Sequence, residues 1–305
     1  MNKRGHERRC TGGATEERIA ALKNDPRFTE ALRGFAETIA SQYRNRWLLN
    51  RLLNDRGRFL LVLLALDLHY YGEEGQDLPG LTAGRLKTAC VSHGVCSAGR
   101  ATAMLATMRL FGLLSEGPGR DRRERRLIPT EQLLGIHRER LVQVFTVIAG
   151  IMPEGAMGTQ NLGREDFLAA FVHALMDCFR SGLRPLDWAP ELTVFADRDG
   201  GMPVALALLA NHLAQGAETN RPSGDGLTIA GIAARYSVSR AHVLSILRQA
   251  EAAGLILRTP DNRITVTPQM VDRFKDFFAG VVLLQCDAIT KALASSPPPP
   301  RSRRA

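Results

Sequence analysis

The chain has 305 residues, of which 45% are hydrophobic and 23% are charged. This length and balance suit one large core or two domains of ordinary size, and they exclude a fibrous, collagen-like or wholly disordered chain. Forty Lys and Arg against 31 Asp and Glu give a formal charge of +9, which favours an anionic partner such as nucleic acid or a membrane surface.

The first residues, MNKRGHERRC, are charged and lack the apolar core of a secretion signal. The longest strongly apolar run, residues 59–66, is far shorter than the roughly 20 residues that span a bilayer. We therefore expect a cytoplasmic protein that does not cross a membrane. No pair of cysteines has CxxC spacing and no HExxH motif occurs, so no metal or cofactor is predicted. The five scattered cysteines are Cys10, Cys90, Cys96, Cys178 and Cys286.

An internal repeat is the most informative feature of the sequence. Residues 94–114 align with residues 236–256 at a constant offset of 142. Each copy follows an apolar helical stretch, at 58–72 or 202–216, and each precedes a long amphipathic helix. The pattern predicts that a unit of roughly 140 residues has been duplicated.

The repeat and the composition of the remaining segments together predict five parts. The first and last lack hydrophobic periodicity, and the middle one is rich in Pro, Gly and polar residues. In chain order these are a disordered basic tail (1–26), a first unit with long flanking helices (27–152), a linker (153–163), a second unit (164–294) and a disordered Pro- and Arg-rich tail (295–305).

The first copy begins with a short predicted helix at 82–89. Ser97 stands at the N-cap of the next helix, 97–110, along which Met104, Leu105, Met108 and Leu110 lie. A hairpin follows, and its tip at 117–126 holds five arginines against Asp121 and Glu124. This tip is the most basic short window in the chain.

The second copy repeats this order. Residues 229–233 form a short helix, Ser239 caps a second helix, and Gly254 ends it. Strands are predicted at 255–258 and 263–266 around a turn. Two helices followed by a β-hairpin make a winged helix-turn-helix. The predicted fold class is therefore mostly α with short β-hairpin wings, in two tandem winged helix-turn-helix units.

In a bound winged helix the N-terminal face of the second helix enters the major groove, and the wing lies along the backbone or in the minor groove. Arg100 and Arg240 are the candidates for contact with bases or phosphates. The predicted DNA-binding residues are Ser97, Ala98, Arg100, Ala101 and Thr102 in the first helix, Arg120, Asp121, Arg122, Arg123, Arg125 and Arg126 in the wing, and Ser239, Arg240, Ala241 and His242 in the second copy.

The two copies differ in charge. Residues 1–152 hold 24 Lys and Arg against 16 Asp and Glu, whereas residues 153–305 hold 16 against 15. This difference predicts that the first unit makes most of the contacts with DNA. The second unit is expected either to bind a weaker half-site or to serve as a scaffold.

The order of helices, together with GRDRRERRLIPTEQLL at 119–134, resembles the MarR family of transcriptional regulators. The resemblance covers 55–150 well and 200–292 weakly, and Pro129 departs from the family pattern. It implies wing contacts through Asp121 and through Arg122 or Arg123. Members of the family are usually single units that dimerise through terminal helices, so a tandem chain implies a pseudo-dimer, with a homodimer through the long terminal helices still open.

The resulting hypothesis is a sequence-specific DNA-binding transcriptional regulator, with double-stranded DNA as its partner. A small-molecule effector would bind near Trp47, His69, Tyr70 and Tyr71, where ordinary packing is an equal explanation. Cys90 and Cys96 flank the turn before the first recognition helix, so they are either a redox switch or, more commonly, inert buried thiols.

Three alternatives to a regulator are an enzyme, a replication initiator and an interaction scaffold. The chain contains no P-loop, no GxGxxG after a strand and no GxSxG, so we expect no enzyme activity. A plasmid replication initiator also carries two winged helices in one chain, and it would bind an array of direct repeats. A winged-helix interaction scaffold would have lost DNA binding altogether.

Overall fold

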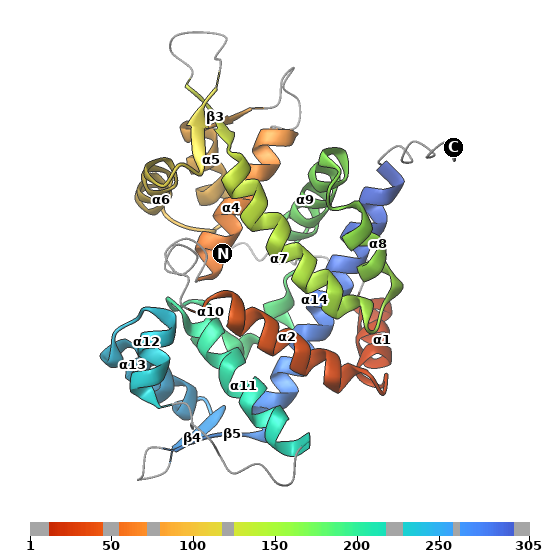
Figure 1. Cartoon of the computed structure of the whole chain (residues 1–305), viewed down its shortest axis with the longest axis vertical. Helices are drawn as coiled ribbons and strands as arrows, with labels where there is room; N and C mark the ends of the chain where they lie inside the picture. Colours follow the sequence, from red (N-terminus) through yellow and green to blue (C-terminus); the bar gives the residue numbers. More distant parts are fainter. Residues whose placement is uncertain are drawn as a thin grey trace, which may run out of the picture.

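The computed structural model describes residues 12–44, 55–71, 80–117, 125–217, 228–258 and 263–295. Within these ranges the chain is mostly helical and has small antiparallel sheets (Figure 1). The predicted mostly helical class is therefore confirmed.

The first half of the chain runs from short N-terminal helices through a helix pair to a hairpin and a long helix. Its elements are α1 (Gly12–Lys23), α2 (Phe28–Gln42), α4 (Arg56–Tyr70), β1 (Leu81–Thr82), α5 (Ala83–Ser92), α6 (Ala98–Leu110), β2 (Leu114–Glu116), β3 (Arg126–Pro129) and α7 (Glu131–Ala149).

The second half follows the same order from its long apolar helix onward: a helix pair, two strands and a closing helix. Its elements are α8 (Pro153–Asn161), α9 (Glu165–Arg180), the 3₁₀ helices η1 (Pro185–Asp187) and η2 (Pro190–Leu192), α10 (Thr193–Ala196), α11 (Gly201–Ala217), α12 (Ile229–Tyr236), α13 (Arg240–Ala252), β4 (Ile256–Arg258), β5 (Ile264–Val266) and α14 (Pro268–Ser295).

The second helix of each pair begins where the sequence predicts. The hydroxyl of Ser97 accepts a hydrogen bond from the backbone N–H of Arg100 at 3.3 Å, and that of Ser239 accepts one from His242 at 3.1 Å. Each bond satisfies one of the backbone donors that a helix start leaves without a partner. Both predicted N-caps are confirmed.

The strands after each helix pair form hairpins. β2 and β3 pair antiparallel with Leu114 opposite Pro129, and β1 adds to the other edge of β3, so the sheet has the order β1-β3-β2. β4 and β5 make a two-stranded hairpin with Ile256 opposite Val266. The first hairpin therefore stands on a broader base than the second.

An early helix of each half, α2 or α9, also packs against the other half. α2 packs against α7 of its own half and α11 of the other, while α9 packs against α14 of its own half and α4 of the other. α1 lies on α14, and α8 lies on α7. Phe28 and Phe35 contact the ring of Phe278 at centroid distances of 5.3 and 4.9 Å. One continuous apolar core therefore joins both halves, and neither half can bury its apolar surface alone.

The predicted linker is a helix. Residues 153–161 form α8, and a Cβ on Gly155 would overlap the backbone of Ala149. A Cβ on Gly158 would meet the ring of Phe145 at 2.7 Å. The segment expected to be a linker is therefore mostly helical, because these two glycines let a short helix pack directly against α7.

The predicted N-terminal tail is also partly helical. Residues 12–23 form α1, which buries Ile19 and Leu22. Arg18 pairs with Asp287 of α14 at 2.7 Å. The disorder prediction for 1–26 is therefore wrong from residue 12 onward, because a partner helix covers the apolar side of α1. Residues 1–11 and 296–305 lie outside the described ranges.

Among the described helices, α14 alone is long and apolar enough to cross a bilayer by length and composition. Half of that apolar window is buried inside the protein. Its buried face includes Met270, Phe274, Phe278, Val282 and Ile289, which belong to the common core. Its apolar character is therefore accounted for by core packing, and the cytoplasmic location stays a prediction.

Candidate nucleic-acid interface

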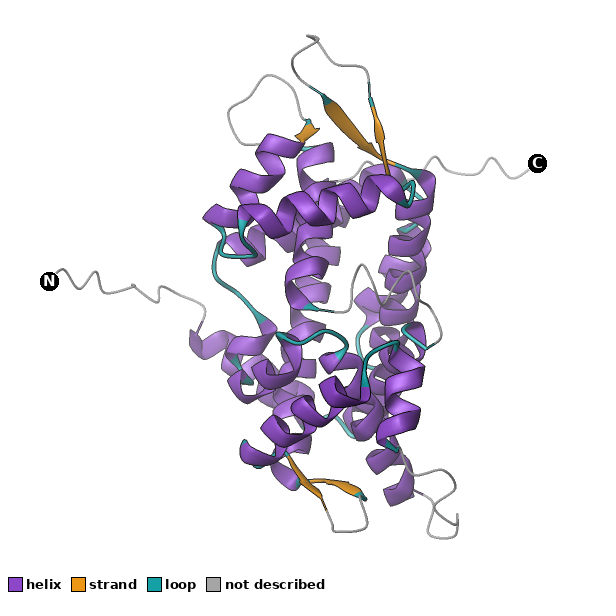
Figure 2. Cartoon of the chain, turned by 90° about the vertical axis from the view of Figure 1, so that its left-hand side faces the viewer, coloured by secondary structure: helices purple, strands orange, loops and turns teal. Residues whose placement is uncertain are grey.

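The second helices of the two pairs lie on the same side of the molecule. Figure 1 shows α6 and α13 on its left-hand side, with the β2–β3 hairpin at one end of the long axis and the β4–β5 hairpin at the other. In Figure 2 this side faces the viewer, and the hairpins again stand at opposite ends. Two helices and two hairpins are therefore presented on one elongated face.

The outward side of α6 carries small side chains. Ala98, Gly99, Thr102, Ala103 and Ala106 are exposed, as is Ser97 just before the helix. Ala101, in contrast, is fully buried with Met104, Leu105 and Met108. The prediction that Ala101 faces DNA is therefore wrong. The helical period of the three buried apolar residues places Ala101 on their face and leaves Leu110, which is 80% exposed, on the other.

Arg100 is tied to a buried carboxylate. Its Nη2 lies 2.7 Å from Oδ2 of Asp55, whose side chain is only 4% exposed. Asp55 also caps α4 by accepting from the N–H of Arg58 at 3.0 Å, and it pairs with the Arg58 guanidinium at 3.1 Å. A carboxylate this deeply buried needs both cations to offset its lost hydration. The Arg100 side chain remains half exposed, so it both fixes α6 on α4 and offers a cationic edge to solvent.

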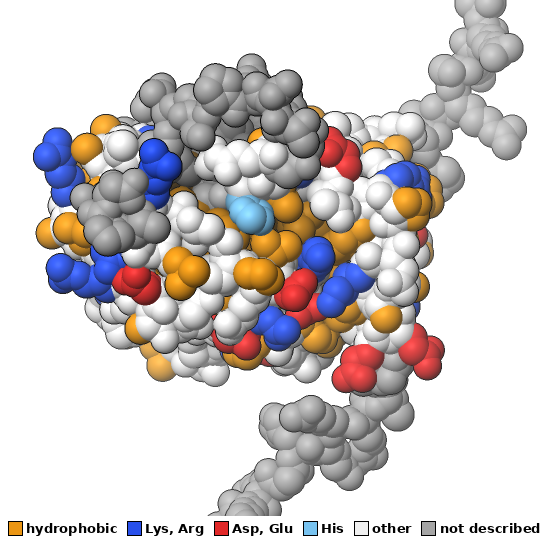
Figure 3. Space-filling model, turned by 90° about the horizontal axis from the view of Figure 1, so that it is seen from below, with side chains coloured by type: hydrophobic (Ala, Val, Ile, Leu, Met, Phe, Trp, Pro, Cys, Tyr) orange, Lys and Arg blue, Asp and Glu red, His pale blue; other side chains and the backbone are white. Residues whose placement is uncertain are grey.

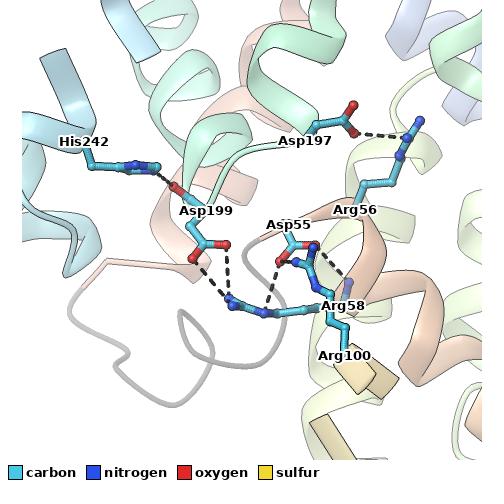
Figure 4. A network of polar contacts seen from close by, with 7 residues as sticks. All are labelled: Asp55, Arg56, Arg58, Arg100, Asp197, Asp199 and His242. Atoms are coloured by element: carbon cyan, nitrogen blue, oxygen red, sulfur yellow. Dashed lines mark hydrogen bonds and ion pairs between the residues drawn. The ribbon is translucent and has the colours of Figure 1, made fainter. Parts of the chain in front are cut away.

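The same network reaches the other helix pair (Figure 4). The carboxylate of Asp199 lies 3.4 Å from Arg58, and its backbone carbonyl lies 2.9 Å from Nε2 of His242. His242 therefore points inward to the segment before α11. A run of polar contacts joins the N-terminal turns of α6 and α13, which holds the two helices in one relative orientation.

The outward side of α13 is more polar than that of α6. Arg240 and Ala241, both predicted, are exposed, and so is Arg248, while Ser245 and Gln249 are half exposed. The last three were missed by sequence reasoning, which considered only the first turn. The signal was present, because Ala241, Ser245 and Arg248 follow the helical period on the side opposite the buried residues.

Arginines gather at this end of the molecule. Figure 3 views it from below and shows Lys and Arg side chains at the left-hand edge, the side on which α12 and α13 lie. Arg258 is paired with Glu251 at 2.5 Å. The arginines of α12, α13 and the second hairpin that are exposed or half exposed are Arg235, Arg240, Arg248, Arg258 and Arg263. The second unit is thus locally basic although its half of the chain is nearly neutral.

Only the base of the first hairpin lies within the described residues. Arg125 is exposed and lies 3.8 Å from Glu116, while Arg126 is half exposed in β3. Glu116 is also held by Arg109 at 2.5 Å, so the stem is braced against the end of α6. The predicted contacts Arg120, Asp121, Arg122 and Arg123 lie outside the described residues.

The predicted effector residues lie at the end of α4. Tyr71 stacks on His173 of α9 at 4.1 Å, and burial raises the pKa of Tyr70 to about 12 and lowers that of His69. Trp47 lies outside the described residues. A cavity of about 230 Å³ lies elsewhere, between α4 and α6, with Arg58, Cys96 and Arg100 among its lining residues.

Comparisons with models of known protein families, with curated proteins and with solved structures found no match. Within the described ranges, no group of three or more His, Cys, Asp or Glu is placed to hold a metal ion.

Proposed function

We propose that this protein is a sequence-specific DNA-binding transcriptional regulator of MarR-like type, in which two winged helix-turn-helix units in one chain form a pseudo-dimer. One observation carries the proposal: two serine-capped helices stand uncovered on one side of the molecule, each followed by a hairpin, with the hairpins at opposite ends (Figures 1 and 2). A dimeric helix-turn-helix protein presents this arrangement to two half-sites of a duplex.

The duplex would run along the long axis of this face, with α6 and α13 in successive major grooves about one turn, roughly 34 Å, apart. The exposed backbone ends and hydroxyls of Ser97 and Ser239 suit phosphate contacts. The two hairpins would then follow the backbone outward. The inter-unit network around Asp55 and Asp199 supports this proposal because it holds both helices in a fixed orientation before binding.

The two helices are suited to different tasks. Arg248 and Arg240 of α13 can donate to guanine, and Gln249 suits adenine. The small side chains of α6 let its backbone approach the groove closely, and Thr102 offers a methyl group to thymine. We therefore assign most base reading to α13 and most backbone attachment to the first unit, with Arg125 at its wing stem.

Duplex selection from a random library followed by footprinting tests the proposal with the full chain. The expected result is one site with two unequal half-sites, protected on one face of the duplex and separated by about one helical turn. An array of direct repeats would instead indicate a replication initiator. Absence of enrichment at physiological salt would refute DNA recognition.

A second candidate, a protein-interaction scaffold, is favoured by one feature of α6. Its outermost stripe is Gly99, Ala103, Ala106 and Leu110, which is uncharged and ends in a leucine that is 80% exposed. Such a stripe suits another protein as well as it suits DNA. A chain that binds no selected duplex but whose stable complex with a protein is lost in Ala106→Arg would be assigned to this function.

A further inference from the structure

Two cysteines lie on either side of the turn between α5 and α6. Cys90 is in the last turn of α5, and Cys96 directly precedes the N-cap Ser97. The backbone carbonyl of Cys90 accepts from the N–H of Val95 at 2.8 Å and from that of Cys96 at 3.4 Å. After burial, the nearby Cys96 thiol is the next cause that raises the pKa of the Cys90 thiol, so the two side chains are neighbours. The pair is therefore joined by a direct backbone hydrogen bond, and its two thiols are close enough to influence each other.

A disulfide joins residues whose Cα atoms lie roughly 4.4–6.8 Å apart. The direct backbone hydrogen bond between Cys96 and Cys90 gives the pair the proximity that such a bond needs. Both cysteines are free thiols in the structure. Cys90 is fully buried, whereas Cys96 is half buried and lines the cavity of about 230 Å³ between α4 and α6. A small oxidant that enters this cavity therefore meets Cys96 first.

We propose that Cys96 and Cys90 are a peroxide-sensitive thiol pair that closes to a disulfide and displaces the start of α6. The sulfur of Cys96 attacks one peroxide oxygen, so that an S–O bond forms, the O–O bond breaks and one water leaves. The sulfur of Cys90 then attacks the sulfenic sulfur. An S–S bond forms, the S–O bond breaks, and the hydroxide takes the Cys90 proton and leaves as a second water. Two thiols lose two electrons, and one peroxide becomes two waters.

The order of the two steps follows from the surroundings of each thiol. Burial raises the pKa of Cys90 to about 12, so this thiol stays protonated near neutral pH. It is thus a poor first nucleophile toward peroxide. It can still act second, because the sulfenic acid of Cys96 would form in contact with it.

Closure would act directly on the recognition helix. An S–S bond of about 2.05 Å is much shorter than a contact between two thiols, so Cys96 must move toward α5. Ser97 and the first turn of α6 follow it. That turn carries Arg100, which is bound to Asp55 and so to the network that reaches His242. Oxidation of one turn therefore disturbs both helices of the proposed interface.

The chemistry can be tested without DNA. We would treat the full chain with hydrogen peroxide, alkylate it in denaturant, and map the peptides by mass spectrometry. The expected product loses two hydrogens and links Cys90 to Cys96. Cys96→Ser should abolish the link, whereas Cys178→Ser, a matched control at another buried thiol, should leave it unchanged. Free alkylation of both thiols after peroxide treatment, or a link to a different cysteine, overturns the proposal.

A second variant separates the two steps. Cys90→Ser should stop the reaction at the sulfenic acid of Cys96, which dimedone captures as a thioether. Cys90→Ala serves the same purpose if serine at this buried position prevents folding. Absence of a dimedone adduct at Cys96 in a folded variant would show that Cys96 is not the site of attack.

The regulatory consequence rests on the proposed function and is measured separately. A duplex selected with reduced protein should bind about tenfold more weakly after oxidation, with full recovery in dithiothreitol and no change in Cys96→Ser. If the disulfide forms and affinity is unchanged, the switch is refuted. If the reduced chain binds no duplex, the proposed function fails while the peptide map still decides the thiol chemistry.

Discussion

The helices α6 and α13 bury residues at matching positions but differ in the residues on their exposed faces. Both begin at a serine cap, and their buried residues match at an offset of 142: Ala101, Met104, Leu105 and Met108 correspond to Val243, Ile246, Leu247 and Ala250. On the outside, Ala106 corresponds to Arg248, and Ala103 to Ser245. The comparison teaches that the buried pattern sets the local fold, while the outward residues are free to take different tasks.

Among the helices the second, α13, has the more polar exterior, whereas among the hairpins the first has the more basic sequence. The strands of the first hairpin belong to a three-stranded sheet and are joined by a longer, arginine-rich stretch of sequence, whereas the second is a two-stranded hairpin with a shorter connecting sequence. Net charge alone predicts that the first unit dominates binding. Under the proposed function, the positions of the exposed side chains lead us to expect a division instead, in which the first unit attaches to the backbone and α13 reads bases.

The largest expected effect concerns the network that joins the two units. Asp55→Ala removes the cap of α4 and leaves Arg58 and Arg100 without their buried partner, which should lower the free energy of unfolding by about 2–4 kcal/mol. Asp197→Ala removes the acid 142 positions later, which pairs with Arg56 in a half-exposed bridge. It should cost less than about 1 kcal/mol. Denaturant unfolding of both variants measures the difference, and equal losses would contradict the central role of Asp55.

The next effect tests the division between helices. Arg248→Ala should weaken binding to the selected duplex by about 1–3 kcal/mol and relax the preference at one base pair. Lys291→Ala removes an equal charge from the far end of α14 and should leave both properties unchanged. Anisotropy titrations over a salt series and a repeated selection provide the measurement. A loss at Arg248 that is equal for all duplexes would assign it to phosphate and not to base reading.

A smaller effect concerns the contact between α4 and α9, compared with the corresponding contact between α11 and α2. α4 buries Asp67, which contacts Nδ1 of His173 at 2.8 Å and Arg180 at 2.6 Å, whereas the buried stretch of α11 from Val204 to Ala210 is wholly apolar. The hydrogen bond to Asp67 is the main cause that raises the pKa of His173; the charges of Asp67 and Asp177 add to it, and burial and Arg180 oppose it.

Because the pKa is raised on folding, protonated His173 stabilises the protein fully below its unfolded pKa of about 6.5. This stabilisation should be lost as the pH rises through the higher folded pKa. The difference in unfolding free energy between wild type and His173→Gln, measured from pH 6 to 9, should therefore shrink with rising pH. A difference that stays constant over this range would show that folding does not raise the pKa of His173.

The smallest effect lies in the turns before the two helices. Gly94 has a φ of 64° in the first turn, whereas Ser237 has a φ of 56° in the second. A left-handed conformation favours glycine, so Ser237→Gly should stabilise the protein by about 0.5–1 kcal/mol, and Gly94→Ala should destabilise it by a similar amount. Thermal unfolding of the two variants measures both. Destabilisation by Ser237→Gly would show that contacts of the serine side chain outweigh backbone strain.

Local signals predicted much of the fold and part of the site. The serine caps, the helix pairs and the hairpin strands depend on residues within a few positions of one another, so a single sequence reveals them. The spacing of apolar residues along the whole of each helix also predicts Ala101 in the core and Arg248 on the outside. Arg100 and His242, in contrast, could not be assigned from their neighbours, because their partners Asp55 and Asp199 are distant in sequence.

The sequence by itself thus determined the order of helices and strands and which face of each helix is apolar, because these follow from spacing and caps along one segment. Only the tertiary structure decided that α2 and α9 cross to the opposite half, that α1 and α8 are docked helices, and that the starts of α6 and α13 share one polar network. Such contacts join residues as far apart as Arg58 and Asp199, and their energy depends on burial that no local pattern encodes.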